Sequence, residues 1–320
     1  AKRRSLMPDV FERLARRLDE LPQGFPPTDS GVELRILRKI YSPEDAEVAL
    51  EVKPVPETAA VLAERLERPL EEARALLDEM ARKGQIASQT MSGEQVYMLA
   101  PFVPGIYEFQ VYRLDSELCE MFEEYLPSLL TTVGGYGPGV ARTVPVNTWI
   151  EPESQIYPYE DVRRMIEGAR SFKVIDCICR KERGLVGHRC DHTLENCLVF
   201  SDEENAFDYF SLGGRVISKE ETLRILDATE EEGLVHNALY NTKTGQGAIC
   251  NCCPCCCGLM RAAKDFKAPA AIARSNFVAV IDRDECNECG ICAEERCPME
   301  AIVQDDEVHL VMPDRCIGCG

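Results

Sequence analysis

Apolar side chains recur at helical spacing along the first hundred residues, so several short helices are predicted there. Residues 8–21 place an apolar stripe on one helical face, with arginines around it. This stripe has two interpretations: a docking helix for a partner or a membrane surface, or a terminal helix packed on its own domain. Further helices are predicted at 32–41, after the capping residue Ser42, at 57–66 and at 70–83.

Two strands, 85–90 and 95–99, are predicted on either side of the turn signal Ser92-Gly93. The order of three helices and a hairpin over 31–100 resembles a winged-helix domain of the helix-turn-helix class. That resemblance implies contact with DNA or protein. The recognition helix would be 70–80, where acidic side chains outnumber basic ones. Because a helix beside phosphates normally carries Arg or Lys, we expect a protein contact and no nucleic-acid partner.

Residues 101–170 are predicted to be a connecting module. Its helix, 116–130, contains Cys119 as a buried small hydrophobe. The glycine-rich stretch 134–139 lacks the spacing and the lysine of a phosphate loop, so a turn or hinge is expected. Residues 143–150 are predicted to be extended, either as an edge strand, because of Pro145, or as a segment crossing between domains.

Cysteine is the residue that changes this picture. The chain has 320 residues, a formal net charge of −19 and 17 cysteines. Sixteen of these cysteines lie between 177 and 319, and no signal peptide or membrane-spanning apolar run is visible. A cytoplasmic location is therefore expected, where such a density of thiols indicates metal ligation rather than disulfides.

The middle segment contains ten of these cysteines. A strand over 172–180 is predicted to end in Cys177-Ile178-Cys179, which would place both thiols on one face. Cys190 and Cys197 are expected on a glycine-bearing loop, near His188 and His192. Two helical stretches are predicted between 203 and 240, the second beginning at a capping box formed by Ser218 and Glu221, followed by a strand at 234–236.

The densest stretch has the sequence CNCCPCCC. Its thiols are Cys250, Cys252, Cys253, Cys255, Cys256 and Cys257. Neighbouring side chains point apart, so we expect a division of these thiols between two centres, completed by Cys177, Cys179, Cys190 and Cys197. Two [4Fe–4S] clusters would leave two thiols over, and one cubane beside a non-cubane centre is also possible. Zinc is the alternative, in a site drawn from Cys177, Cys179, His188, Cys190, His192 and Cys197.

The C-terminal end contains a C-x2-C-x2-C-x4-C-P run from Cys286 to Pro298, and a second run begins at Cys316. Strands are predicted at 301–303 and 308–311 between them. Residues 276–320 resemble the two-[4Fe–4S] bacterial ferredoxin domain, whose pattern has one residue fewer before its fourth cysteine. The resemblance implies that Cys286, Cys289 and Cys292 bind one cluster. By the same resemblance, Cys297, Cys316 and Cys319 contribute to the other.

The ferredoxin pattern continues beyond Gly320 with two further cysteines. The sequence is therefore expected to be truncated, and a complete protein with three-cysteine sites is the alternative. The expected fold is α+β and multidomain, with a winged-helix-like start, a cysteine-rich α/β middle and a ferredoxin-like end. The expected segments are an N-terminal docking helix (1–30), the winged-helix-like domain (31–100), the connecting module (101–170), the iron–sulfur domain (171–275) and the ferredoxin domain (276–320).

The chain as a whole resembles iron–sulfur proteins of anaerobes. This implies electron transfer, as a subunit that relays single electrons through several [4Fe–4S] clusters to a partner oxidoreductase. Residues 282–315 have eleven acidic side chains and three arginines, so a redox partner with a basic face, in a hetero-oligomeric complex, is expected. An oxidoreductase with a catalytic cluster at CNCCPCCC is the first alternative. A redox-sensing winged-helix regulator is the second.

Overall fold

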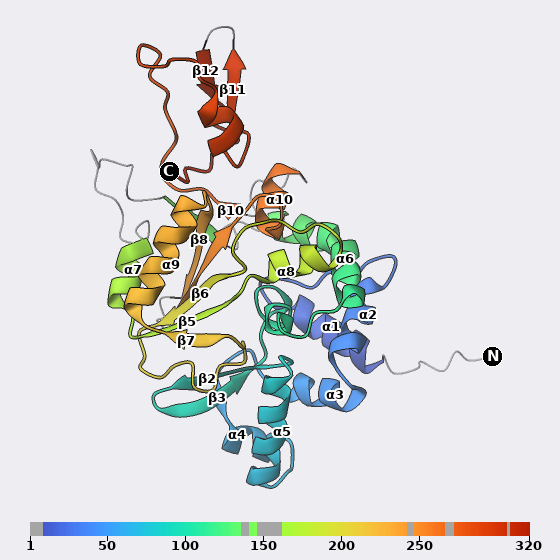
Figure 1. Cartoon of the computed structure of the whole chain (residues 1–320). Coiled ribbons are helices and arrows are strands. Elements are labelled where there is room, and N and C mark those ends of the chain that lie inside the picture. The colour runs from blue at the N-terminus through green and yellow to red at the C-terminus, as the bar shows by residue number, and fades with distance from the viewer. Residues whose placement is uncertain (1–8, 136–140, 146–161, 242–245, 266–271, 306–307) are drawn as a thin grey trace, which may run out of the picture. The chain divides into compact units, whose positions relative to one another are not determined.

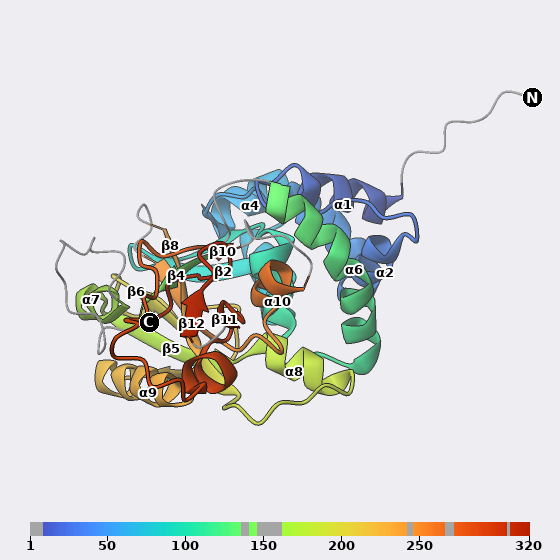
Figure 2. The same ribbon diagram turned by 90° about the horizontal axis from the view of Figure 1, so that it is seen from above.

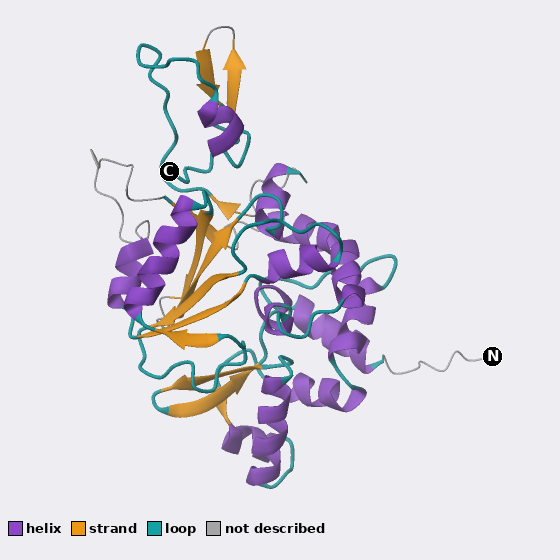
Figure 3. Cartoon of the chain, viewed as in Figure 1, coloured by secondary structure: helices purple, strands orange, loops and turns teal. Residues whose placement is uncertain are grey.

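The computed structural model describes residues 9–135, 141–145, 162–241, 246–265, 272–305 and 308–320 (Figure 1). The chain divides into two compact units. Unit 1 contains the residues up to Thr132 together with Asn205–Gly213, and unit 2 contains Val133–Glu204 and Gly214–Gly320. Both units contain helices and strands, which confirms the expected α+β class (Figure 3).

Unit 1 begins with five helices, each within a predicted helical segment or directly after a predicted cap. They are α1 (Val10–Asp19), α2 (Val32–Ile40), α3 (Pro43–Glu51), α4 (Ala59–Arg65) and α5 (Leu70–Arg82). The predicted hairpin is present as β2 (Ala87–Met91) and β3 (Glu94–Met98), and β1 (Glu57–Thr58) pairs with β3 to give the antiparallel order β1-β3-β2. The helices and the hairpin predicted for residues 31–100 are present, but the order has four helices and the extra strand β1 where the winged-helix resemblance implies three helices and a hairpin.

The apolar face of α1 is buried. Phe11, Leu14 and Leu18 are at most 6% exposed, and α1 packs on α2 and α3. This face therefore contacts the chain itself, as in the second of the two interpretations above. Docking of a partner by residues 1–30 stays a prediction, and it would have to use other side chains.

The last helix of unit 1 begins where the sequence predicts and runs further. It is α6 (Ser116–Gly135), and Cys119 within it is fully buried, as expected. The predicted turn at 134–139 is wrong at its start, because Gly134 and Gly135 still belong to the helix. Residues 136–139 lie outside the described part of the chain. Before α6, the helical turns η1 (Phe102–Ile106) and η2 (Glu108–Gln110) follow the hairpin.

Unit 2 is built on a seven-stranded sheet with the order β10-β4-β8-β9-β6-β5-β7. The strands are β4 (Ala141–Val144), β5 (Ser171–Asp176), β6 (Glu195–Ser201), β7 (Arg215–Ile217), β8 (Val235–Asn241), β9 (Gln246–Cys252) and β10 (Ile272–Ala273). Of the extended segment predicted at 143–150, residues 143 and 144 belong to β4, which lies between β10 and β8 and so is not an edge strand, and residues 146–150 lie outside the described part of the chain. Pro145 follows the strand and so removes no hydrogen bond from it.

One face of this sheet is covered by two helices, α7 (Val162–Gly168) and α9 (Lys219–Glu231), which lie side by side (Figures 1 and 2). The core between sheet and helices contains Ile166, Leu226, Phe200 and Ile249. Because side chains alternate along a strand, the residues next to Ile249 point to the opposite face. Cys250 and Cys252 of β9 therefore face away from α7 and α9.

Helix α9 begins as predicted, with the Ser218 hydroxyl accepting a hydrogen bond from the Glu221 amide at 3.2 Å. The helical stretch predicted before it is wrong. Residues 203–217 form turns and the short strand β7, with Asn205–Gly213 belonging to unit 1.

The C-terminal segment adds η6 (Cys292–Arg296) and the predicted hairpin, β11 (Ile302–Asp305) paired antiparallel with β12 (Val308–Val311). Within the described ranges, every helix is too short or too polar to cross a membrane.

Candidate metal centre

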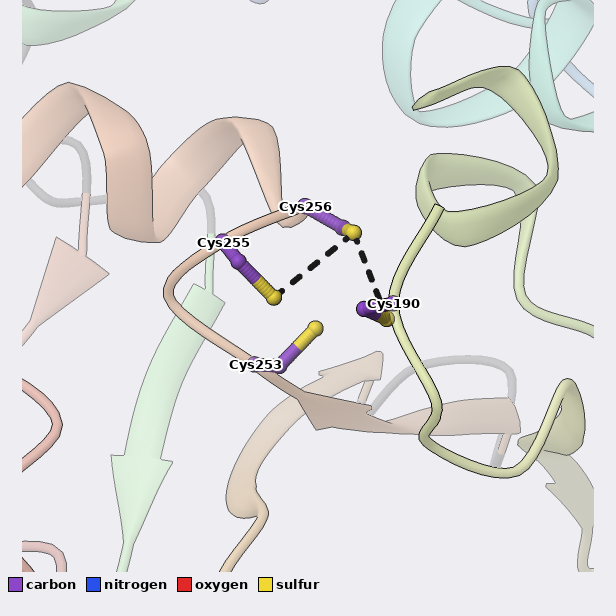
Figure 4. A group of neighbouring side chains, drawn as sticks. All are labelled: Cys190, Cys253, Cys255 and Cys256. Carbon is purple, nitrogen blue, oxygen red and sulfur yellow. Dashed lines mark hydrogen bonds between the residues drawn. The ribbon is translucent and has the colours of Figure 1, made fainter. Parts of the chain in front are cut away.

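Four cysteines of unit 2 converge on one point (Figure 4). The sulfur atoms of Cys190, Cys253, Cys255 and Cys256 all lie within 4.8 Å of one another. We call these four residues the quartet. Among the described residues, the quartet is the group whose ligand atoms come together in this way.

A turn and a loop bring the quartet together. Cys253, Cys255 and Cys256 lie on the turn that connects β9 to α10 (Gly258–Lys264), and the Cys257 amide closes this turn on the Cys253 carbonyl at 3.1 Å. Cys190 comes from the loop after α8 (Ile178–Leu185) (Figure 4). Because the backbone reverses direction within the turn, thiols that are adjacent in the sequence can point to one centre.

The size of the quartet can be compared with that of a metal site. The sulfur of Cys256 lies 3.5 Å from that of Cys190 and 3.8 Å from that of Cys255. Zinc–thiolate bonds of about 2.3 Å in a tetrahedron place the sulfurs about 3.8 Å apart. The four residues therefore fit a single tetrahedral ion, and their soft thiolate donors suit zinc or iron.

The thiols of the quartet titrate as a group. Hydrogen bonds from neighbouring thiols, chiefly that of Cys256, lower the pKa of Cys253 to about 4, and the Arg180 guanidinium adds to this. Burial and the Cys253 thiolate raise the pKa of Cys255 to about 12. The hydrogen bond with Cys253 also raises the pKa of Cys256. At neutral pH, the metal-free quartet therefore holds one thiolate that the other thiols stabilise.

The quartet has a buried side and a solvent side. Cys253 and Cys256 are at most 2% exposed and form a small apolar cluster with Leu234, whereas Cys255 is exposed. A metal held here would have its solvent side at Cys255 and the partly exposed Cys190.

The prediction that Cys177 and Cys179 lie at the end of a strand is wrong. The strand β5 ends at Asp176, Cys177 caps α8, and Cys179 lies in the first turn of that helix. The two thiols nevertheless interact, and this interaction, together with burial, raises the pKa of Cys177. They meet because a helix begins between them, not because they share the face of a strand.

Cys197 also lies elsewhere than expected, on strand β6 rather than on a loop. The residues proposed for a zinc site are therefore divided: Cys190 joins the quartet, Cys197 is hydrogen-bonded to Cys250, and the His192 ring lies 3.5 Å from the Glu232 carboxylate.

Three of the six C-terminal thiols lie close together. Cys297 and Cys316 act on Cys319, and burial together with these neighbours raises the pKa of Cys319 to about 11. The Cys297 sulfur also accepts a hydrogen bond from the Ala301 amide at 3.2 Å. These are the three residues that the ferredoxin resemblance assigns to one cluster.

Neither these three sulfurs nor those of Cys286, Cys289 and Cys292 all lie within 4.8 Å of one another, and Cys289 is exposed. The extra residue before Cys297 has a local explanation. The Cys297 amide donates to the Cys292 carbonyl at 3.0 Å, five residues back, which is the wider turn of a π-helix.

Sequence reasoning missed Arg180, which is 5% exposed and donates hydrogen bonds to the carbonyls of Thr193 and Asn251, both at 2.7 Å. Its position directly after Cys179 was the available signal. His236 is fully buried, with its ring Nδ1 2.6 Å from the Asn251 side chain.

Comparison of the chain with protein-family models, with curated proteins and with solved structures gives no match. The class that the structure itself defines is an α+β protein with a cysteine cluster able to hold a metal.

Proposed function

We propose that this chain is an iron–sulfur electron-transfer protein that relays single electrons to or from a partner oxidoreductase. The observation that carries the proposal is the quartet of Cys190, Cys253, Cys255 and Cys256, with all sulfurs within 4.8 Å. A bound iron centre would supply reversible one-electron chemistry. The protein's part is to hold the four thiolates, keep water from the buried side and supply a compensating positive charge.

The arrangement of the other thiols supports a relay rather than an isolated site. Cys253 and Cys256 pack with Cys179 around Leu234. Cys252 and Cys257 belong to a second apolar cluster with Met299 and Ile317, and Cys297, Cys316 and Cys319 pack against this same cluster. Cys252 and Cys257 of the middle segment thus pack with thiols of the C-terminal segment, and short separations favour electron transfer.

The proposal includes a partner and a location. The acidic C-terminal segment suits a redox protein with a basic face, in a hetero-oligomeric complex and in the cytoplasm. The ferredoxin-like segment would provide the docking end. The enzyme and regulator alternatives have no further support among the described residues.

Anaerobic purification followed by iron, sulfide and zinc analysis tests the proposal, together with EPR of the reduced protein. We expect iron and acid-labile sulfide, about sixteen of each if four four-iron clusters assemble, and an EPR signal after reduction. The double variant C253S/C256S should lose the metal of the quartet. Cys119→Ala is the matched control, because this buried cysteine lies in unit 1 and outside every thiol group.

Zinc is the second candidate, and the size of the quartet favours it. The sulfur separations of 3.5 and 3.8 Å are those of one tetrahedral ion, whereas a four-iron cluster sets its cysteines farther apart. Zinc bound at the quartet, with iron confined to the C-terminal segment, would make the middle segment structural. That result would overturn electron transfer through the quartet.

A further inference from the structure

A small pocket lies in unit 2 between the end of the middle segment and the C-terminal segment. Its volume is about 50 Å³. Its lining comes from α10, from the residue after β10 and from two stretches of the C-terminal segment. The lining side chains that bear on its chemistry are Lys264, Arg274, Met299, Asp314, Arg315 and Ile317. We call it the basic pocket.

Charge distinguishes the basic pocket from its surroundings. Among the described residues that line it, Lys264, Arg274 and Arg315 are cationic and Asp314 is anionic, which gives a net charge of +2. The whole chain has a net charge of −19. Positive side chains placed together repel one another, and a bound anion removes this repulsion. The basic pocket therefore favours an anion.

Backbone carbonyls hold two of the three cations in place. Arg274 donates from Nη1 to the Pro313 carbonyl at 2.7 Å and from Nη2 to the Asp314 carbonyl. Arg315 donates from Nη1 to the Glu300 carbonyl at 2.9 Å. A planar guanidinium that the protein already orients loses little further freedom when it binds a ligand.

The third cation, Lys264, has a partner that a ligand can share. Its Nζ atom lies 2.6 Å from the Glu300 carboxylate, whose side chain is 61% exposed. An ion pair at such an exposed position contributes little to stability. An anion in the pocket can therefore interact with Lys264 at small cost.

The basic pocket has the size of one small oxyanion. A cavity needs about 10–15 Å³ to hold one water-sized group, so this pocket holds about three to five of them. A phosphate ion has four oxygens around one centre. Met299 and Ile317, each 5% exposed, form an apolar part of the lining, which strengthens electrostatic attraction nearby. We propose that the basic pocket binds a tetrahedral dianion, as inorganic phosphate or as the phosphate group of a small ester.

The basic pocket adjoins the C-terminal thiols. Met299 and Ile317 belong to the apolar cluster against which three of these thiols pack, those of Cys297, Cys316 and Cys319. Arg315 directly precedes Cys316, and Lys264 lies on α10, the helix that follows the quartet turn. An oxyanion bound by both cations therefore joins α10 to the segment that carries the C-terminal thiols.

Calorimetric titration of the full chain with inorganic phosphate, after purification without oxygen, tests the proposal. K264Q/R315Q removes two of the three cations. R283Q/R296Q is the matched control, because it removes the same charge at two exposed arginines outside the lining. We expect K264Q/R315Q to weaken phosphate binding by on the order of 10- to 100-fold and the control to bind like the wild type. Equal affinities of the two variants would overturn the site.

A variant with the opposite effect covers the case in which K264Q/R315Q does not fold. Asp314→Asn removes the anionic side chain of the lining, which is exposed, and keeps the carbonyl that accepts from Arg274. We expect it to bind phosphate several-fold more tightly, because a repulsive charge is lost. Asp284→Asn, at an exposed carboxylate outside the lining, is the control. Unchanged or weaker binding by D314N would contradict the proposal.

Chemical modification of the wild-type chain locates the bound ion. Lys264 and Lys181 are matched, since their side chains are 26% and 29% exposed and each forms an ion pair. We expect phosphate to slow acetylation of Lys264 by acetic anhydride and to leave Lys181 unaffected, as mass spectrometry of the modified chain measures. Protection of both lysines, or of neither, would place the ion elsewhere and overturn the site.

Two further ligands identify the source of the phosphate group. Binding of glycerol phosphate as tightly as inorganic phosphate would support a phosphate ester, and binding of inorganic phosphate alone would support the free ion. Acetate that binds as tightly as phosphate would overturn the assignment to a dianion. Phosphate binding does not depend on the proposed relay, because no described residue of the lining is a cysteine. Either can therefore fail while the other stands.

Discussion

Arg180 is the single residue on which most of the candidate site depends. It is almost fully buried and donates to one carbonyl in the loop after α8 and to another on β9. Although burial lowers the pKa of Arg180, its interactions with the sulfurs of Cys177 and Cys253 raise it by more, so the side chain stays charged. It therefore ties the two backbone segments that hold the cysteines and offsets the charge of the thiolates.

Replacement of Arg180 by lysine should weaken metal binding. Lysine keeps the charge but cannot donate to two carbonyls in a fixed plane. Loss of such a supporting partner typically costs 10- to 100-fold in metal affinity. The rate of metal transfer to a chelator measures this, with Lys181→Arg as control, since Lys181 forms a partly exposed ion pair with Asp176 at 3.1 Å. Equal rates for R180K and K181R would contradict the role given to Arg180.

Metal binding by the quartet should depend steeply on pH. Cys253, with a pKa of about 4, is already ionised at neutral pH, whereas the raised pKa values of Cys255 and Cys256 keep these thiols protonated. Metal binding should therefore release the protons of Cys255 and Cys256, and the apparent affinity should fall as the pH falls. Competition titrations with Co²⁺ at several pH values measure the slope. A slope near zero would show that the four thiols do not bind together.

At the scale of elements, local sequence decided the helices and their beginnings. The Ser42 hydroxyl accepts a hydrogen bond from the Asp45 amide at 3.0 Å and so begins α3, as its position before a proline predicts. The boundary between β5 and α8 was misplaced because alternating apolar residues continue past the strand. There the backbone bends at Cys177.

The turn around Gly318 should be intolerant of any side chain. Gly318 has a φ of +68°, and an added Cβ would lie 2.1 Å from the Ser275 hydroxyl and 2.2 Å from the Phe277 carbonyl. We expect Gly318→Ala to displace Cys316 and Cys319 and to reduce metal bound by the C-terminal thiols, while the quartet keeps its metal. Gly233→Ala is the control, because Gly233 has a similar φ of +73° and open space around it. A similar loss in both variants would point to the backbone conformation alone.

The turn η2 contains a carboxyl group that should make unit 1 sensitive to pH. Burial raises the pKa of Glu108 to about 7, although the Gly105 amide donates to this carboxylate at 2.6 Å. A raised pKa favours the folded state at low pH, and this stability is lost as the pH rises through 7. Glu108→Gln should therefore raise the free energy of unfolding at pH 8 by on the order of 2–3 kcal/mol relative to the wild type, and by much less at pH 5. Urea unfolding at the two pH values measures this difference. The same difference at both pH values would contradict the burial effect.

At the scale of the whole molecule, charge is the feature that bears on function. The net charge of −19 is concentrated in part at the C-terminal segment, where Glu294 and Glu295 are exposed. Such a segment attracts a basic partner at long range, and salt screens the attraction.

Electron exchange with a small basic redox protein should slow as the salt concentration rises. The charge reversal E294K/E295K should slow it further at low salt, by several-fold. E71K/E72K is the matched control, since it makes the same change of charge on exposed residues of α5 in unit 1. Stopped-flow kinetics measure the effect. Equal rates for the two variants would show that the C-terminal segment is not the docking site.

The sequence by itself determined the five helices with which unit 1 begins, both hairpins and the concentration of cysteines in unit 2. These features depend on hydrophobic periodicity, caps and turn residues within a few positions, and on the number of cysteines. It also predicted that the thiols of CNCCPCCC divide between two centres, because consecutive side chains point apart.

Only the tertiary structure decided which thiols meet. Cys190 joins Cys256, which is 66 residues away, and Arg180 reaches Asn251 across 71 residues. Such contacts depend on the order of strands in the sheet and on the loops between them, which local patterns do not encode. The face of β9 toward α7 and α9 became an apolar core, and the opposite face brought Cys250 and Cys252 to the remaining thiols. Packing of the sheet, rather than the spacing of its cysteines, therefore built the site.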